Sequence, residues 1–210
     1  MQTLNAKNLT LDDVHRLFGI QQQVCDSFTD LLSLEPLTDF EQQELEQIQQ
    51  DFGRYLSAGK VSEGQIKFLV VAPLMRLAGF YRSPLQITLE EDIESIVIQD
   101  EETTITGRLN ILTVAKNQSI ARFWILVIES KNSSIDVFAG LPQLLTYTYR
   151  QLEQQSSVWG LVTNGRNYLF VYSQQNSPPI YTLLPELSLT NLERRSQLLQ
   201  VLKAIRQGVD

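Results

Sequence analysis

Residues 123–131 carry the sequence FWILVIESK, in which six consecutive apolar residues lead into Glu129, Ser130 and Lys131. A run that is apolar on both faces predicts a central strand covered on both sides. Because side chains alternate along a strand, Glu129 and Lys131 should share a face with Val127. Two charges at the end of a buried strand cost free energy unless they are paired or bind a metal. The alternative is that the strand simply ends here and both groups reach water.

Further strands are expected on either side of this one. The apolar pattern predicts strands over residues 87–99, 103–114 and 121–130, with a turn at Glu101-Glu102 and another over 116–119. Strands over 158–163 and 168–172 flank Asn164-Gly165, a dipeptide that strongly favours a β-hairpin. A short strand is expected over 181–184.

Helical patterns fill the first 80 residues and two later segments. Thr10 should cap a helix whose apolar spacing continues to Leu32, with a break at Gly19. Another helix is expected from Thr38 to Leu56, with its buried face formed by Leu45, Ile48, Phe52 and Tyr55. Ser62 and Gln65 form a capping box that begins a third helix, which Pro73 should kink and Gly79 should end. Helices capped by Ser133 or Ser134 and reaching Glu153, and over 192–205, complete a pattern typical of an α/β or α+β protein.

The composition excludes several classes of chemistry. The chain has 210 residues, of which 43% are hydrophobic and 20% charged, as in an ordinary globular protein. A single histidine, His15, and a single cysteine, Cys25, exclude an internal disulfide and a zinc site built from several Cys or His ligands. The net charge of −7 argues against a surface that coats nucleic acid. No run is long enough to span a membrane and no export signal is found, so a cytoplasmic location is expected.

Polar residues of three segments should meet at the end of the central strand. Residues 107–112 would pair antiparallel with the central strand, which brings Asn110 beside Glu129. On the helix that follows, Gln143, Tyr147 and Arg150 lie on one stripe. One pocket could therefore hold Asn110, Glu129, Lys131 and Gln143, with Glu63 contributed by the third helix.

Four motifs in this order resemble a known family. They are GRLNIL at 107–112, VIESK at 127–131, LPQLLTY at 141–147 and VTNG at 162–165. Together they resemble the PD-(D/E)xK nuclease fold, especially the nuclease domain at the start of type I restriction enzyme R subunits. They are also similar to small cyanobacterial proteins described as restriction endonuclease subunit R-like. The resemblance implies an α/β restriction endonuclease-like core, a mixed central sheet flanked by helices, over residues 61–210, with an N-terminal helical extension over residues 1–60.

The resemblance also implies roles for individual residues. Glu129, Asn110 and the backbone carbonyl of Ser130 would hold Mg²⁺ or Mn²⁺, with Glu63 matching a helix carboxylate that some members use. Lys131 would stabilise charge at the scissile phosphate, and Gln143 would steady the lysine or the attacking water.

Asn110 stands where active members of the family have an aspartate. An amide supplies no negative charge, so weak metal binding and slow or absent cleavage are expected. Glu90 or Glu94 could compensate if the first strand places either of them at the site.

Two functions follow from these alternatives. One is Mg²⁺-dependent DNA hydrolysis weakened by Asn110, with Arg108, Arg150, Arg166 and Tyr147 contacting DNA. The other is a catalytically inactive nuclease-fold module that binds nucleic acid or a partner protein, a restriction-modification subunit being one such partner. A homodimer through the helix at 38–57 is a third expectation, and no membrane association is expected.

Overall fold

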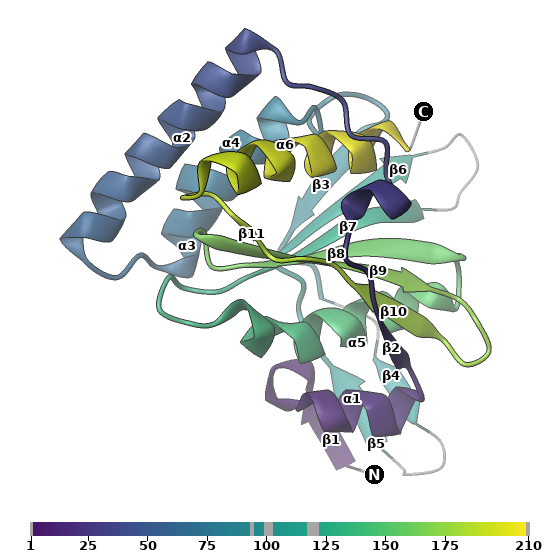
Figure 1. The fold of residues 1–210 in the computed structure, drawn as a ribbon. Helices are drawn as coiled ribbons and strands as arrows, with labels where there is room; N and C mark the ends of the chain where they lie inside the picture. The colour runs from purple at the N-terminus through teal and green to yellow at the C-terminus, as the bar shows by residue number, and fades with distance from the viewer. Residues whose placement is uncertain (1, 93–94, 99–102, 117–121, 209–210) are drawn as a thin grey trace.

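The computed structural model describes residues 2–92, 95–98, 103–116 and 122–208. Most of its strands belong to one mixed sheet (Figure 1). Across this sheet the strands follow the order β2 (Gln21–Val24), β10 (Ile180–Leu183), β9 (Asn167–Gln174), β8 (Ser157–Thr163), β7 (Arg122–Ser130), β6 (Ile111–Lys116) and β3 (Leu85–Leu89), and β11 (Leu187–Ser188) also pairs with β9. The pairs β7–β8 and β2–β10 are parallel and the others are antiparallel. The expected mixed α/β class is confirmed.

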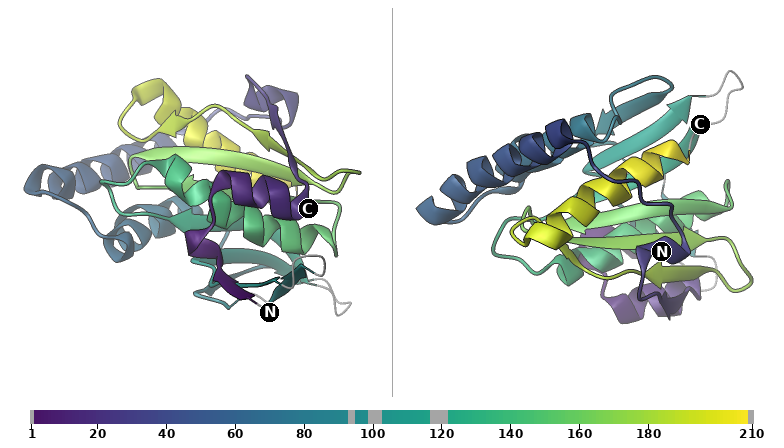
Figure 2. Two further views of the ribbon diagram at one scale, coloured as in Figure 1. Left: turned by 90° about the horizontal axis from the view of Figure 1, so that it is seen from below. Right: turned by 45° about the horizontal axis from the view of Figure 1, so that its top comes forward.

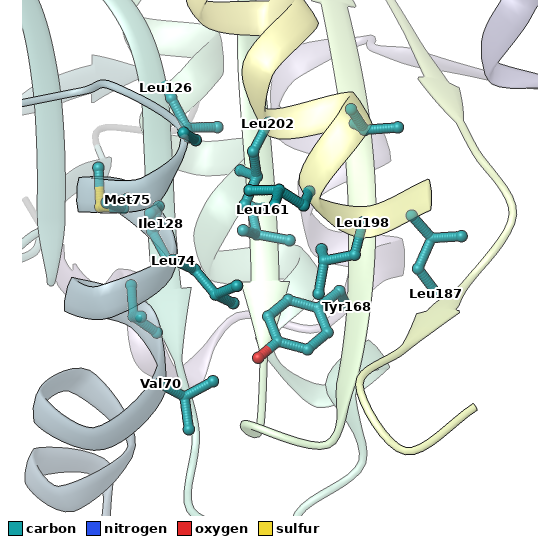
Figure 3. Close-up of a cluster of buried hydrophobic side chains, with 14 of the residues drawn as sticks. Val70, Leu74, Met75, Leu126, Ile128, Leu161, Tyr168, Leu187, Leu198 and Leu202 are labelled. Carbon is teal, nitrogen blue, oxygen red and sulfur yellow. The ribbon is translucent and has the colours of Figure 1, made fainter. Parts of the chain in front are cut away.

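The strand β7 occupies the centre that its apolar sequence predicts. Leu126 and Ile128 face one hydrophobic cluster, whereas Val127 faces another, and all three are at most 1% exposed. Figure 3 shows Leu126 and Ile128 in the first cluster, together with Leu74 of the helix α4 (Ala72–Leu77) and Leu202 of the helix α6 (Leu192–Gln207). Both faces of the strand are therefore covered.

Helices lie on both faces of the sheet (Figure 2). On one face lie α6, α4, α2 (Asp39–Ala58), α3 (Glu63–Ile66) and the π-helical turn η3 (Lys67–Val71), and on the other lie α1 (Leu11–Phe18) and α5 (Leu141–Leu152). Single turns of 3-10 helix precede or follow these elements at η1 (Ala6–Asn8), η2 (Phe28–Asp30) and η5 (Val137–Gly140). No helix in the described part of the chain has the length and apolar character needed to cross a bilayer.

Several helix boundaries follow the predicted caps. Thr10, Thr38 and Ser62 each cap a helix, and each belongs to a capping box. Gly79, with φ of +90°, follows the end of α4 as predicted. The turn before Pro73 is the π-helical turn η3, in which the N–H of Ala72 donates to the carbonyl of Lys67, and the kink expected at Pro73 stays a prediction.

Three helical expectations are wrong in detail. The helical spacing does not continue past Gly19, because residues 21–24 pair with β10 as the strand β2. Tyr55 is 43% exposed, because the buried face of α2 consists of Leu45, Ile48 and Phe52. Neither Ser133 nor Ser134 caps the helix before Glu153, because Asp136 caps η5 and α5 continues from it.

The two long strands expected over 87–99 and 103–114 are each broken in two. After β3, Glu90 has a φ of +53°, which interrupts the extended chain, and its N–H donates to the carbonyl of Asn110. Beyond Glu90 the chain forms β4 (Ile96–Ile98) and β5 (Thr103–Thr106). These strands belong to a separate sheet, in the order β1-β5-β4, together with β1 (Gln2–Asn5) from the start of the chain. The turn expected at residues 101–102 and most of the one at 116–119 lie outside the described residues.

Candidate functional site

The predicted polar residues meet in one hydrogen-bonded cluster at the end of β7. Asn110 Nδ2 donates to Glu129 Oε2 at 2.6 Å, and Lys131 Nζ donates to Glu129 Oε1 at 2.9 Å. Lys131 Nζ also donates to Gln143 Oε1 at 3.0 Å, which joins the cluster to α5. Antiparallel pairing of Ile111 with Ile128 places Asn110 next to Glu129, as the sequence predicted. The alternative, in which the charges simply reach water, is wrong for Glu129 because its residue is 1% exposed.

Burial governs the electrostatics of Glu129. Desolvation raises the pKa of Glu129, whereas the nearby Lys131 ammonium and the hydrogen bond from Asn110 lower it. The charge of Glu63 also raises the pKa of Glu129, which places that exposed carboxylate within electrostatic range of the site. The ion pair with Lys131 therefore offsets most of the free-energy cost of burying the negative charge of Glu129.

A second chain of hydrogen bonds fixes Gln143. Its Nε2 donates to Tyr147 Oη at 2.7 Å, and the tyrosine hydroxyl donates to the carbonyl of Arg108 at 3.0 Å. Tyr147 is completely buried, and desolvation raises its pKa to about 12, so the phenol remains a donor at neutral pH. The predicted stripe of Gln143 and Tyr147 thus connects α5 to the segment that precedes Asn110.

Two glycines allow this close packing. A Cβ on Gly140 would lie 2.5 Å from Val162 and 3.1 Å from Cε of Lys131. A Cβ on Gly107 would lie 2.8 Å from the ring of Tyr147. The sequence carried both glycines in or next to the quoted motifs, but it gave no sign that the Lys131 and Tyr147 side chains depend on them.

The oxygen atoms of this cluster do not fit a hard divalent cation as they stand. Both oxygens of Glu129 accept hydrogen bonds, and Asn110 Oδ1 accepts one from Ser130 Oγ at 3.2 Å. Mg²⁺ favours sites with carboxylate charge, whereas Glu129 and Lys131 together are neutral. Within the ranges that the structure describes, no three His, Cys, Asp or Glu residues are grouped so that they could hold a metal ion.

The structure gives little support for the expectation that Glu90 or Glu94 supplies the negative charge that Asn110 lacks. Glu90 Oε1 lies 3.6 Å from Lys67 Nζ, and Glu90 Oε2 lies 3.7 Å from Arg108 Nη2. Its carboxylate is therefore engaged with two cations at the surface. Glu94 lies outside the described residues.

The residues expected to contact DNA have different surroundings. Arg108 pairs with Glu90 and with Asp92, and Arg150 pairs with Glu153. Arg166 is exposed after the hairpin turn, whereas the Tyr147 ring is buried inside the protein. Acidic neighbours thus offset two of the three arginines.

Comparison with known proteins gives little beyond this geometry. No family model matches the chain, and no curated protein matches it. One solved structure that matches is a fragment of a putative HsdR subunit of a type I restriction enzyme from Vibrio vulnificus YJ016, with 19% identity and a TM-score of 0.41. The match covers 65% of this chain and 25% of that one, so the chain spans about a quarter of that structure.

Proposed function

We propose that the chain is a restriction endonuclease-like module of the PD-(D/E)xK type that does not cleave DNA in its present form. The observation that carries this proposal is that Asn110 and Lys131 occupy both oxygens of Glu129. In a metal-dependent nuclease of this kind, a second carboxylate would face Glu129 and the pair would require a cation. Here an amide occupies that position, and the cluster is satisfied without one.

A protein partner suits this module better than DNA does. The net charge is −7, and acidic neighbours offset Arg108 and Arg150. Affinity for duplex DNA depends mainly on cationic side chains that neutralise phosphates. We therefore propose that the module binds another protein, and a restriction-modification subunit is the partner class that the family resemblance implies.

Substitution of Asn110 tests the absence of cleavage. The wild type, Glu129→Ala, Asn110→Asp and the double variant Asn110→Asp/Glu129→Ala are incubated with duplex and single-stranded DNA in Mn²⁺ or Mg²⁺. We expect the wild type to match Glu129→Ala, and we expect Asn110→Asp to bind Mn²⁺ in calorimetry and to cleave DNA. Cleavage by the wild type above the Glu129→Ala background would overturn the proposal. Failure of Asn110→Asp to bind Mn²⁺ would count against a site derived from a nuclease.

The choice of partner has a separate test. Fluorescence anisotropy of a labelled DNA duplex is measured with the wild type and with Arg166→Ala at low and physiological salt. We expect no binding at physiological salt. Tight, salt-dependent binding that Arg166→Ala weakens would favour DNA as the partner.

One observation favours a second candidate, a weak metal-dependent nuclease. The carboxylate of Glu63 acts electrostatically on Glu129, so a second acid is near the site. If this acid compensates for Asn110, slow cleavage by the wild type will be lost in Glu63→Gln as well as in Glu129→Ala. Substitution of the exposed Glu63 should leave the fold intact, which makes the loss interpretable.

A further inference from the structure

The strand β3 ends the larger sheet with one edge that pairs with no strand in the described part of the chain (Figure 1). Its other edge pairs with β6, and Glu90 donates to the carbonyl of Asn110 in the same register. Bonded pairs alternate in an antiparallel ladder, so residues 86 and 88 also face β6. The backbone N–H and C=O groups of Ile87 and Leu89 therefore point away from the sheet, as does the carbonyl of Leu85, whose N–H donates to the carbonyl of Arg82 at 3.0 Å.

Pro84 and Glu90, whose φ is +53°, limit this edge at its two ends, but the five residues between them have no such protection against pairing with another chain. Natural edge strands are blunted by charged residues, by proline or by a bulge. Residues 85–89 read LQITL, with neither charge nor proline, and they pair with β6 in unbroken register. Leu89 is 63% exposed on this edge.

The apolar face of β3 continues into an open apolar pocket of about 620 Å³. Leu85, Ile87 and Leu89 form one wall of this pocket, and Phe68, Met75 and Phe80 are among the residues that form the rest. Phe68 at its rim is 76% exposed and Tyr81 is 53% exposed. Exposed apolar surface beside an unpaired strand is typical of a surface that receives another strand.

We propose that β3 pairs with β3 of a second copy of this chain, antiparallel and about a two-fold axis at Ile87. In this register Leu85 lies opposite Leu89 of the second copy, and Ile87 lies opposite itself. Ile87 and Leu89 carry outward N–H and C=O groups, so the Ile87 pair exchanges both backbone bonds and the N–H of each Leu89 donates to the carbonyl of Leu85 in the other copy. The N–H of Leu85 needs no partner in the second copy, because it already donates to the carbonyl of Arg82 at 3.0 Å. The two-fold axis is perpendicular to the sheet, which places the two apolar pockets on the same face and next to each other. This proposal is independent of whether the site at Glu129 cleaves DNA.

The charges at the two ends of β3 favour a second copy over an unrelated peptide. Arg82 precedes the strand, whereas Glu90, Glu91 and Asp92 follow it. Within one copy Glu90 also lies near Lys67 and Arg108, and Asp92 lies near Arg108, all as surface pairs. Antiparallel pairing brings the basic end of each strand to the acidic end of the other. The same segment is thus complementary to itself in apolar pattern and in charge.

Disulfide trapping tests the register. In a Cys25→Ser background, which removes the natural thiol, Ile87→Cys places two thiols on a bonded pair whose Cα atoms lie about 5.5 Å apart, within the range of a disulfide. Leu89→Cys is the matched control, because the two copies of residue 89 would be separated by about 13 Å along the strands. We expect a covalent dimer under mild oxidation for Ile87→Cys and none for Leu89→Cys. Equal trapping of both variants, or of neither, would overturn the register.

Sedimentation velocity over a wide concentration range tests the dimer without a cross-link. Leu89→Lys should weaken self-association by about 100-fold, because each copy loses a buried leucine. The control is Val24→Lys on β2, at the opposite edge of the sheet, where Val24 is 69% exposed. A wild type that remains monomeric, or a dimer that Val24→Lys dissociates while Leu89→Lys does not, would overturn the proposal. Binding of an unrelated strand peptide to a monomeric wild type would do the same.

Discussion

Replacing Lys131 with methionine should lower the free energy of unfolding, because it leaves the buried charge of Glu129 without its partner. The Glu129 side chain is 2% exposed and that of Lys131 is 16% exposed, so the ion pair is largely closed to solvent. Breaking a buried pair costs about 3–5 kcal/mol, because the remaining charge has no partner. Lys131 retains some access to water and Asn110 still donates to Glu129, so we expect the lower value, about 3 kcal/mol.

Urea denaturation at neutral pH measures this loss, and two further variants identify its cause. Glu129→Gln/Lys131→Met removes both charges and should recover the free energy of unfolding to within about 1 kcal/mol of the wild type. The control is Lys67→Met, which breaks a pair whose carboxylate, that of Glu90, is 58% exposed. Such a surface pair contributes about 0–1 kcal/mol.

The cost of Lys131→Met should also depend on pH. Without the ammonium, the pKa of Glu129 rises further above its value in the unfolded chain. The folded state then binds the proton more tightly than the unfolded state, so the free energy of unfolding increases as the pH falls through this window. The deficit relative to the wild type should therefore shrink in mild acid. A loss at neutral pH no greater than that of Lys67→Met would show that water screens Glu129, and would refute the closed ion pair.

Three other substitutions test the packing around the site. Gly140→Ala should lower the free energy of unfolding by about 2 kcal/mol, since the new Cβ lies 2.5 Å from Val162, and urea denaturation will show it. Gly165→Ala should cost about 3 kcal/mol in the same assay, because φ there is +83° and the Cβ would lie 2.6 Å from Phe52; a loss below that of Gly140→Ala would contradict this. Tyr147 has a pKa raised to about 12, so native protein keeps a proton that the unfolded chain loses near pH 10, and stability should fall as the pH rises between these values. Tyr147→Phe should make that fall shallower in thermal melts, and an unchanged slope would contradict the assignment.

The central part of the site could be predicted because it depends on short-range rules. Alternation along β7 places Glu129 and Lys131 on one face, and antiparallel pairing with the preceding segment brings Asn110 to Glu129. The helical repeat of α5 places Gln143 above Tyr147. Each step needs only the identity of neighbouring elements, which the apolar run and the hairpin signal supplied.

The remaining differences arise from contacts that are distant in sequence. β2 is polar at three of its four positions, and it becomes a strand only because β10 lies beside it. The break after β3 depends on the backbone of a single residue, Glu90, whose φ of +53° is unusual for a glutamate. The dependence of Lys131 on Gly140 likewise exists only once η5 approaches β8.

The amide at position 110 allows this site to be complete without a cation. With aspartate there, two carboxylates would face each other beside one ammonium, and the buried site would carry an unbalanced negative charge unless a metal ion bound. With asparagine, one carboxylate pairs with one ammonium. The amide of Asn110 donates a hydrogen bond to Glu129 and accepts one from Ser130. The same hydrogen bonds then hold β6, β7 and α5 together. On the function proposed above, asparagine in place of aspartate would convert a site that depends on metal into one that stabilises the fold on its own.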